Sequence, residues 1–175
     1  MAKNGGLMTE WTYPYLSWSG KDFDKCQFDK AQSVVNVTGY TKLPSNQYEP
    51  LMDAIAKKGP IAISVEAITW KNYESGIFNG CNQTNPDLDH AVQLVGYGEE
   101  NGQGYWIVRN SWTPYWGEKG FIRLLRTDNE GERCGMDITP QDGSGCKGGP
   151  SSVKVCGTCG ILFDNVIPTI GTKPN

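Results

Sequence analysis

The fold is decided by three consecutive stretches, His90-Ala-Val-Gln-Leu-Val-Gly-Tyr97, Gly98-Glu-Glu-Asn-Gly-Gln-Gly104 and Tyr105-Trp-Ile-Val-Arg-Asn110. The outer two are rich in residues that favour strands, and the middle one is a strong turn signal. If the strands pair antiparallel with the turn centred near residue 100, His90 lies directly opposite Asn110. The sequence therefore predicts a β-hairpin that brings the only histidine beside an asparagine, provided that no β-bulge breaks the register.

A histidine beside an asparagine has a chemical use. The amide oxygen accepts a hydrogen bond from one imidazole nitrogen, which leaves the other nitrogen free as a base or ion-pair partner. Trp112 follows closely and can shield this hydrogen bond from water. Taken alone, the pair also fits a surface histidine that meets an asparagine on a barrel rim. One histidine, with cysteines in loops, makes a poor set of metal ligands, so neither a metal nor a cofactor is expected.

Other elements surround the hairpin. Ile61–Val65 and the stretch 120–125 are predicted strands, and a short helix is predicted from Pro50, ended by Gly59-Pro60. The 22 glycines and 10 prolines among 175 residues indicate many turns rather than a helical bundle. A formal net charge of −3 gives no reason to bind nucleic acid or an anionic membrane.

Six cysteines and two Asn-x-Thr sequons, at Asn36 and Asn82, favour an oxidising, secretory environment. No signal peptide is visible after Met1, and no stretch has the roughly 20 apolar residues of a membrane helix. The sequence is therefore expected to be a processed chain or a fragment.

The motifs Asp89-His90-Ala91-Val92, Tyr105-Trp-Ile-Val-Arg-Asn-Ser-Trp112 and Trp116-Gly-Glu-Lys-Gly120 resemble those of the papain-like cysteine peptidases, nearest to the cathepsin L branch. The resemblance implies an α+β fold, mainly the β-barrel half of the two-lobed papain-like domain. It also implies that His90 is catalytic, that Asn110 orients it, that Trp112 covers their contact and that Trp116 lines the leaving-group side. In this family a thiolate–imidazolium pair attacks a peptide carbonyl.

One part of the family pattern, the motif of the nucleophilic cysteine, is missing from this sequence. In the family, this Cys-Gly-Ser-Cys-Trp-like motif stands roughly 130–150 residues before the histidine, which would place it about 40–60 residues upstream of Met1. Residues 1–175 are thus expected to be the C-terminal part of one peptidase domain, with a Cys/Gly-rich insertion at about 135–158. The expected function is a cysteine endopeptidase, incomplete and inactive as given. The alternative is a non-catalytic remnant that binds peptides or a partner protein.

The resemblance also implies partners and a location. The expected partners are polypeptide substrates and the missing N-terminal half of the domain, and the expected location is lysosomal, vacuolar or secreted. Asp164 would lie at the base of the pocket for the second residue before the scissile bond, with Leu88, Ala67 and Ala91 as walls. A solvated turn aspartate is the alternative for Asp164.

The cysteines leave alternatives open. Cys156-Gly-Thr-Cys159 is interpreted as disulfide scaffolding rather than as a redox or nucleophile motif, because it follows the histidine and no helix follows it. By resemblance, Cys81 bonds near the chain end, where Cys134 and Cys159 compete. We predict Cys81–Cys134, with local bonds among the remaining insertion cysteines and with Cys26 free, because its family partner lies upstream.

Overall fold

The computed structural model describes residues 3, 5–20, 25–143, 145 and 148–171, and it divides into two compact units. The smaller unit comprises Met1–Thr41 and Pro168–Asn175, and the larger comprises Lys42–Ile167. The larger unit contains the predicted hairpin. No helix in the described ranges is long and apolar enough to cross a membrane.

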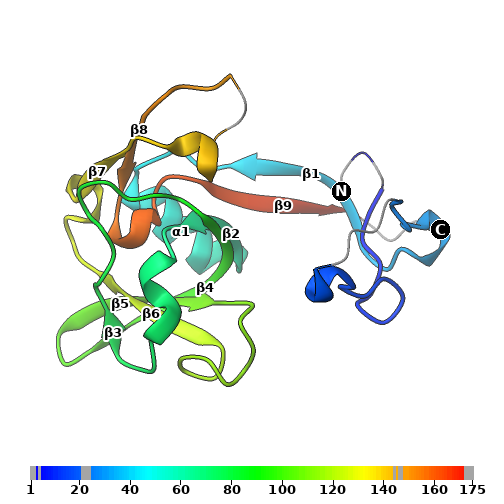
Figure 1. Cartoon of the computed structure of the whole chain (residues 1–175), viewed down its shortest axis with the longest axis horizontal. Helices are drawn as coiled ribbons and strands as arrows, with labels where there is room; N and C mark the ends of the chain where they lie inside the picture. Colours follow the sequence, from blue (N-terminus) through cyan, green and yellow to red (C-terminus); the bar gives the residue numbers. More distant parts are fainter. Residues whose placement is uncertain (1–2, 4, 21–24, 144, 146–147, 172–175) are drawn as a thin grey trace. The chain divides into compact units, whose positions relative to one another are not determined.

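Strands make up most of the regular structure (Figure 1). In chain order they are β1 (Asn36–Lys42), β2 (Ile61–Val65), β3 (Ile77–Phe78), β4 (His90–Glu100), β5 (Gln103–Arg109), β6 (Phe121–Arg126), β7 (Cys134–Asp137), β8 (Val153–Cys156) and β9 (Asn165–Gly171). Within the described ranges, one α-helix, α1 (Tyr48–Lys58), accompanies the short 3₁₀ helices η1 (Ser17–Ser19), η2 (Lys30–Gln32), η3 (Ile68–Asn72), η4 (Glu130–Glu132), η5 (Pro140–Asp142) and η6 (Thr158–Gly160). The fold is therefore α+β, as predicted.

The main sheet of the larger unit has the strand order β9-β2-β4-β5-β6-β3. Neighbouring strands are antiparallel, except that β3 runs parallel to β6. The strands predicted on either side of the hairpin are confirmed as β2 and β6. One face of the hairpin contributes Leu94, Trp106 and Val108 to the core, and all three are fully buried.

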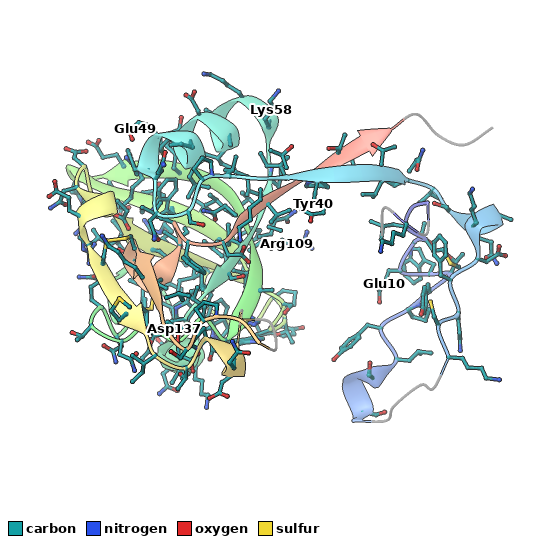
Figure 2. All side chains as sticks on the ribbon, turned by 90° about the horizontal axis from the view of Figure 1, so that it is seen from above. Glu10, Tyr40, Glu49, Lys58, Arg109 and Asp137 are labelled. Atoms are coloured by element: carbon teal, nitrogen blue, oxygen red, sulfur yellow. A yellow bond between two sulfur atoms is a disulfide. The ribbon has the colours of Figure 1, made fainter. Side chains whose placement is uncertain are left out.

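Helix α1 covers part of this core. Leu51, Ala54 and Ile55 are its buried residues, at the spacing of one helix face. Glu49 lies in the first turn and Lys58 in the last, where each charge complements the helix dipole (Figure 2). The helix begins two residues before the predicted Pro50 and ends, as predicted, before Gly59-Pro60.

The predicted hairpin is present, but its register differs from the prediction. The Asn101-Gly102 turn has φ of 53° and 77°, as a two-residue hairpin turn requires. The turn is therefore centred beyond residue 101, and the ladder ends with Gln93 opposite Arg109. Continuing that register places Asn110 two residues from the position opposite His90, so the predicted direct opposition is wrong.

A β-bulge nevertheless keeps the two side chains on one face. The register shifts by one residue between Leu94 and Gly96, because Val95 has no partner of its own on β5. With an unbroken register from the turn, Asn110 would oppose Gln93 and would lie on the other face from His90. The bulge thus keeps His90 and Asn110 on the same face of the hairpin, whereas we expected a bulge to separate them.

The disulfide prediction is corrected by the structure. Cys81 bonds to Cys159, and Cys134 bonds to Cys156, so the predicted bond Cys81–Cys134 is wrong. Strands β7 and β8 pair antiparallel and place Cys134 directly opposite Cys156, with their Cα atoms 4.0 Å apart. The second bond closes the Cys/Gly-rich segment at its two ends, so the predicted local bonding is wrong for Cys156.

The remaining cysteines behave differently. Cys26 is free and exposed, as predicted. Cys146 lies outside the described residues, so its predicted local bond is not described. Both cysteines of the Cys156-Gly-Thr-Cys159 motif are in disulfides with other partners, which confirms the scaffolding interpretation.

Candidate active site

The centre of the candidate site is a hydrogen bond between His90 and Asn110. His90 is the first residue of β4 and Asn110 directly follows β5, so both lie at the open end of the hairpin. Nε2 of His90 lies 2.9 Å from Oδ1 of Asn110. Because an amide oxygen only accepts, Nε2 carries the proton and Nδ1 is the basic nitrogen. Among the described residues, none forms a hydrogen bond with Nδ1.

The amide of Asn110 is held in one orientation. Its Oδ1 also accepts a hydrogen bond of 2.7 Å from the backbone N–H of Ser111, and its own backbone N–H donates to the carbonyl of Gly120 at 2.9 Å. Its Nδ2 is buried and has no partner within the described part of the chain. Rotating the amide would put a donor against the N–H of Ser111, so Oδ1 stays directed at His90.

Tryptophan rings surround the His90 imidazole. Trp112 stacks on it with ring centroids 5.2 Å apart, and Trp116 meets Trp112 edge-on, also at 5.2 Å. Trp70 of η3 stacks on Trp116 at 6.2 Å and meets His90 edge-on at 6.3 Å. Nε1 of Trp116 donates to the carbonyl of Trp70 at 3.2 Å. These rings limit the access of water to the His90–Asn110 bond, which strengthens it.

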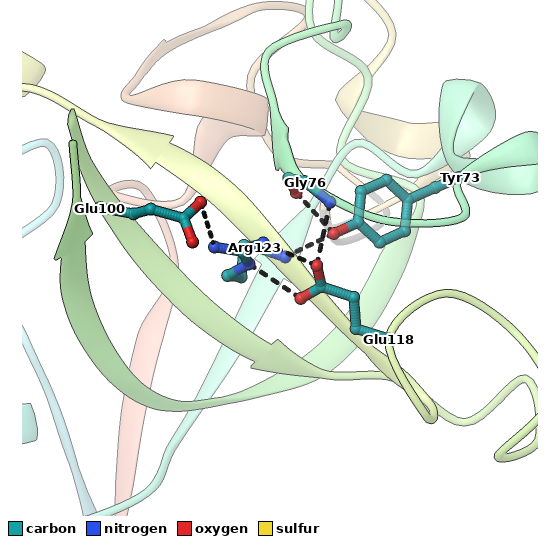
Figure 3. Close-up of polar contacts among 5 residues, drawn as sticks. All are labelled: Tyr73, Gly76, Glu100, Glu118 and Arg123. Atoms are coloured by element: carbon teal, nitrogen blue, oxygen red, sulfur yellow. Dashed lines mark hydrogen bonds and ion pairs between the residues drawn. The ribbon is translucent and has the colours of Figure 1, made fainter.

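A charged cluster fixes the β5–β6 loop that carries the two site tryptophans (Figure 3). Nε and Nη2 of Arg123 each donate to the Glu118 carboxylate at 2.8 Å, and Nη1 donates to Glu100 at 3.0 Å. Glu118 also accepts from the N–H of Gly76, and the Tyr73 hydroxyl donates to the carbonyl of Gly76. The hydrogen bonds from Arg123 hold the pKa of Glu118 below its ordinary value, against the opposing effect of burial.

Asp164 lies beside Ser64 and Lys42. Its carboxylate accepts a hydrogen bond from Oγ of Ser64 at 2.8 Å and forms an ion pair of 2.8 Å with Nζ of Lys42. Burial raises the pKa of Asp164, but the hydrogen bonds from Lys42 and Ser64 outweigh it, so the net shift is downward. The carboxylate is thus ionised and already partnered.

The other predicted pocket residues are divided between the surface and the interior. Ala91 is exposed and pairs with Ser64 across β4 and β2. Leu88 and Ala67 are buried, at 1% and 3% exposure. An open hollow of about 300 Å³ is lined by Ala91 and Asn110, among others. Ala91 and Asn110 therefore line the same hollow. The predicted pocket for the second residue before the scissile bond stays a prediction.

Several residues around the site were not predicted from the sequence. Trp70 comes from a 3₁₀ helix with no periodic signal, and only the three-dimensional contact reveals it. Arg123 and Glu118 are separated by one tight turn, and their opposite charges were the available signal. The described residues contain no group of three or more His, Cys, Asp or Glu side chains that could hold a metal ion.

Comparisons with known proteins agree on one family. The family model described as papain family cysteine protease matches residues 1–150. Germination-specific cysteine protease 1 of Arabidopsis thaliana is 45% identical over 141 residues, which are 78% of this chain and 36% of that protein. A cathepsin L-like proteinase of Phaedon cochleariae is 44% identical over 137 residues, covering 77% of this chain and 40% of that protein.

Solved structures give the same result. Digestive procathepsin L 3 of Tenebrio molitor larval midgut superposes with a TM-score of 0.70 at 36% identity, covering 94% of this chain and 44% of that chain. The bromelain protease of Ananas comosus gives a TM-score of 0.70 at 32% identity, covering 96% and 65% respectively. The chain thus spans 36% and 40% of the length of the two curated relatives.

Proposed function

Since the chain belongs to the papain family of cysteine proteases, we propose that it supplies the catalytic histidine, His90, and its orienting residue, Asn110, to a cysteine endopeptidase. Nδ1 of His90 would take the proton of a cysteine thiol and form a thiolate–imidazolium pair. The thiolate attacks the peptide carbonyl, and the imidazolium then protonates the leaving amine. Water hydrolyses the resulting acyl-enzyme, with His90 as the base.

The observation that carries this proposal is the bond between Nε2 of His90 and Oδ1 of Asn110, covered by Trp112. It fixes the tautomer that leaves Nδ1 as the proton acceptor. A histidine of purely structural use has no need of this arrangement, in which one nitrogen is tethered and the other has no partner among the described residues.

We place the nucleophilic cysteine outside residues 1–175, upstream of Met1. Four of the six cysteines are held in disulfides, which removes them as nucleophiles. Neither Cys26 nor Cys146 stands in a Cys-Gly-Ser-Cys-Trp-like motif. Residues 1–175 would form the C-terminal part of one peptidase domain, with 135–158 as an insertion, and the N-terminal half would be its partner.

The substrates of the complete enzyme would be polypeptides, and its location lysosomal, vacuolar or secreted. Its relatives include cathepsin L-like and plant cysteine proteases, and the two disulfides suit an oxidising compartment. The proposed role of Asp164, to bind a basic substrate side chain, requires that side chain to share the carboxylate with Lys42.

The test is complementation. The 175-residue chain is co-folded with the N-terminal half of its Arabidopsis relative and assayed with a fluorogenic Phe-Arg peptide. We expect cleavage that a thiol-alkylating reagent abolishes, and none from the lone chain. His90→Ala should reduce kcat/KM by roughly three or more orders of magnitude, and Asn110→Ala by less. Asp53→Asn, at an exposed ion pair, is the matched control.

Two results would contradict the proposal. Alkylation-sensitive turnover by the lone chain would place the nucleophile within residues 1–175. A folded, monodisperse complex without thiol-dependent cleavage would favour the non-catalytic peptide-binding alternative.

A further inference from the structure

Two segments that are far apart in the sequence lie side by side in the larger unit. The first is the stretch 83–89, which leads directly into His90, and the second is the stretch 134–143, which contains β7 and η5. The backbone N–H of Met136 donates to the carbonyl of Thr84 at 3.0 Å. The start of the Cys/Gly-rich segment is therefore bound to the approach to the candidate catalytic histidine.

This contact continues along both segments. The backbone N–H of Ile138 donates to Oδ1 of Asn85 at 3.2 Å. Further along, a Cβ atom added to Gly143 would lie 3.3 Å from Cα of Asp89 and would overlap the carbonyl oxygen of Leu88. The close approach at this position admits only a glycine, so the two segments pack tightly as far as the residue before His90.

Two carboxyl groups lie within this contact. Asp137 is fully buried, and its Oδ1 accepts a hydrogen bond of 2.9 Å from the N–H of Thr139. Its Oδ2 and Oδ1 of Asp87 are both buried and have no hydrogen-bond partner among the described residues. Burial is the largest cause of the raised pKa of Asp87, and the charge of Asp137 is the next. The two unpartnered oxygens thus belong to neighbouring acids, which we call the acid pair.

The other charged groups around the acid pair do not neutralise it. Asp89 and Asp142 also raise the pKa of Asp87. Burial raises the pKa of Glu66, and the charges of Asp89 and Asp87 add to this effect against a hydrogen bond from a backbone N–H. Lys154 of β8 is exposed, and its side chain lies on the opposite face of the β7–β8 hairpin from the acid pair. A buried carboxylate pair in such surroundings favours keeping a proton.

We propose that Asp87 and Asp137 share one proton, which holds the segment leading to His90 against the segment that contains β7. Oδ1 of Asp87 would carry the proton and donate it to Oδ2 of Asp137, so that both unpartnered oxygens gain a partner. Asp137 is the better acceptor, because the N–H of Thr139 stabilises its ionised form. When the proton is lost as the pH rises, two negative charges face each other in a buried position and the contact loosens.

Hydrogen bonds connect the acid pair to the residue before His90. The N–H of Asp89 donates to the carbonyl of Asp87 at 3.0 Å, and Oδ1 of Asp89 accepts from the N–H of Ala67 at 2.8 Å. A movement of Asp87 would therefore reach His90 through one residue. The shared proton itself goes beyond the proposed function and does not depend on peptidase activity.

The first experiment observes the proton directly. The full chain is isotopically labelled at the side-chain carboxyl carbons of aspartate, and nuclear magnetic resonance follows their signals from about pH 3.5 to about pH 8. Acids that share a proton titrate in common steps, so Asp87 and Asp137 should show the same two midpoints, one of them above the ordinary aspartate range. Asp87→Asn or Asp137→Asn should remove the upper midpoint. Asp142→Asn, the matched control, removes a nearby charge and should leave both common steps.

The second experiment measures whether the proton holds the two segments together. The amides of Met136 and Ile138 donate across the contact, so their hydrogen exchange reports its opening. Relative to intrinsic exchange rates, their protection should fall several-fold between about pH 5 and about pH 7.5 in the wild type. Asp87→Asn supplies a permanent N–H donor and should abolish this fall, whereas Asp142→Asn should retain it.

Each other outcome overturns the inference. Independent titration of Asp87 and Asp137 excludes a shared proton, and protection that falls equally in the wild type and in Asp87→Asn excludes its structural role. Calcium chloride at millimolar concentration that raises the protection at neutral pH, but not in Asp87→Asn, would place a cation between the carboxylates instead. The complementation assay measures cleavage and not proton binding, so failure of either proposal leaves the other standing.

Discussion

Asn110 acts on His90 through one well-directed oxygen. Its Oδ1 is held by the N–H of Ser111 and accepts from Nε2 of His90, and Trp112 lies over the imidazole. Such a covered hydrogen bond slows the exchange of its proton with water. Since His90 is the only histidine, its ring N–H proton can be followed without ambiguity.

The first prediction concerns this proton. In nuclear magnetic resonance spectra of the chain near neutral pH, a ring N–H signal of His90 should be visible. Asn110→Ala should broaden it beyond detection, because the acceptor is lost, and Trp112→Ala should broaden it because water gains access. Ser111→Ala keeps the backbone N–H and should preserve the signal. An unchanged signal in Asn110→Ala would mean that Asn110 does not restrain the imidazole.

Glu118 matters because its carboxylate joins the β5–β6 loop to Arg123 and Gly76. Glu118→Gln should lower the free energy of unfolding by about 1–3 kcal/mol, since hydrogen bonds to a charged, partly buried group are lost. Urea unfolding followed by tryptophan fluorescence measures this. Asp53→Asn breaks an exposed pair with Lys57 and should cost less than about 0.5 kcal/mol. Equal effects of the two variants would contradict the anchoring role of Glu118.

At the scale of elements, the two disulfides close loops of different length. The sequence separations are 78 residues for Cys81–Cys159 and 22 for Cys134–Cys156. Loop entropy predicts losses of about 4.5 and about 3.4 kcal/mol, respectively, when both cysteines of a pair are replaced by alanine. Chemical denaturation of the two double variants checks the order, and a non-reducing peptide map checks the pairing. A peptide linking Cys81 to Cys134 would overturn both.

The segment before His90 should make stability depend on pH. Burial, and then the charges of Asp137, Asp89 and Asp142, raise the pKa of Asp87. Asp87 and Asp137 each have one buried oxygen without a partner among the described residues. A raised carboxyl pKa means that the folded state binds more protons than the unfolded state. The contribution of Asp87 to stability therefore falls as the pH rises from about 4 through its folded pKa.

Asp87→Asn tests this sign. The variant should gain stability relative to the wild type at about pH 7, and the gain should shrink towards about pH 4. Asp164→Asn is the control with the opposite sign, because the pKa of Asp164 is lowered. Its loss should be greatest near neutral pH and should diminish below about pH 4. Urea unfolding at several pH values measures both, and a gain for Asp87→Asn that is independent of pH would contradict the prediction.

Local patterns predicted most of these elements. Short apolar runs with β-branched or aromatic residues predicted β2, β4, β5 and β6, and Gly59-Pro60 predicted the end of α1, because these signals act over a few residues. The hairpin register could not be predicted, because a bulge depends on which side chains the completed core accepts. The prediction of the disulfide pairing failed for a similar reason. Cys134 and Cys159 sit in nearly identical Cys-Gly motifs, and only the pairing of β7 with β8 separates them.

Within the site, the sequence predicted the meeting of His90 and Asn110 but not its surroundings. Trp70 contacts His90 from η3, and Tyr73 meets Arg123 across segments far apart in the chain. Contacts of this kind are set by tertiary packing, so no local sequence pattern predicts them. The roles assigned to Leu88, Ala67 and Ala91 came only from resemblance and remain predictions.

At the scale of the whole molecule, the two units differ in burial. Large apolar side chains of the smaller unit are exposed, including Trp11 at 93% and Tyr15 at 66%. The larger unit contains the main core cluster. Limited trypsin digestion of the full chain should therefore cleave after the exposed Lys25 before it cleaves at Lys57 or Lys58 in α1, whose backbone is helical. Mass spectrometry of early fragments checks the order, and first cleavage within α1 would contradict it.

The bulge in β4 resembles a dislocation in a crystal, because the register of β4 and β5 differs by one residue on its two sides. If the defect glided towards His90, Leu94 would turn out of the core, where it is now fully buried. Burying one such side chain is worth about 1.5–3 kcal/mol, so Leu94 pins the dislocation. The core position of Leu94 thereby helps to keep the bulge between the turn and His90, where it leaves the histidine on the same face as Asn110.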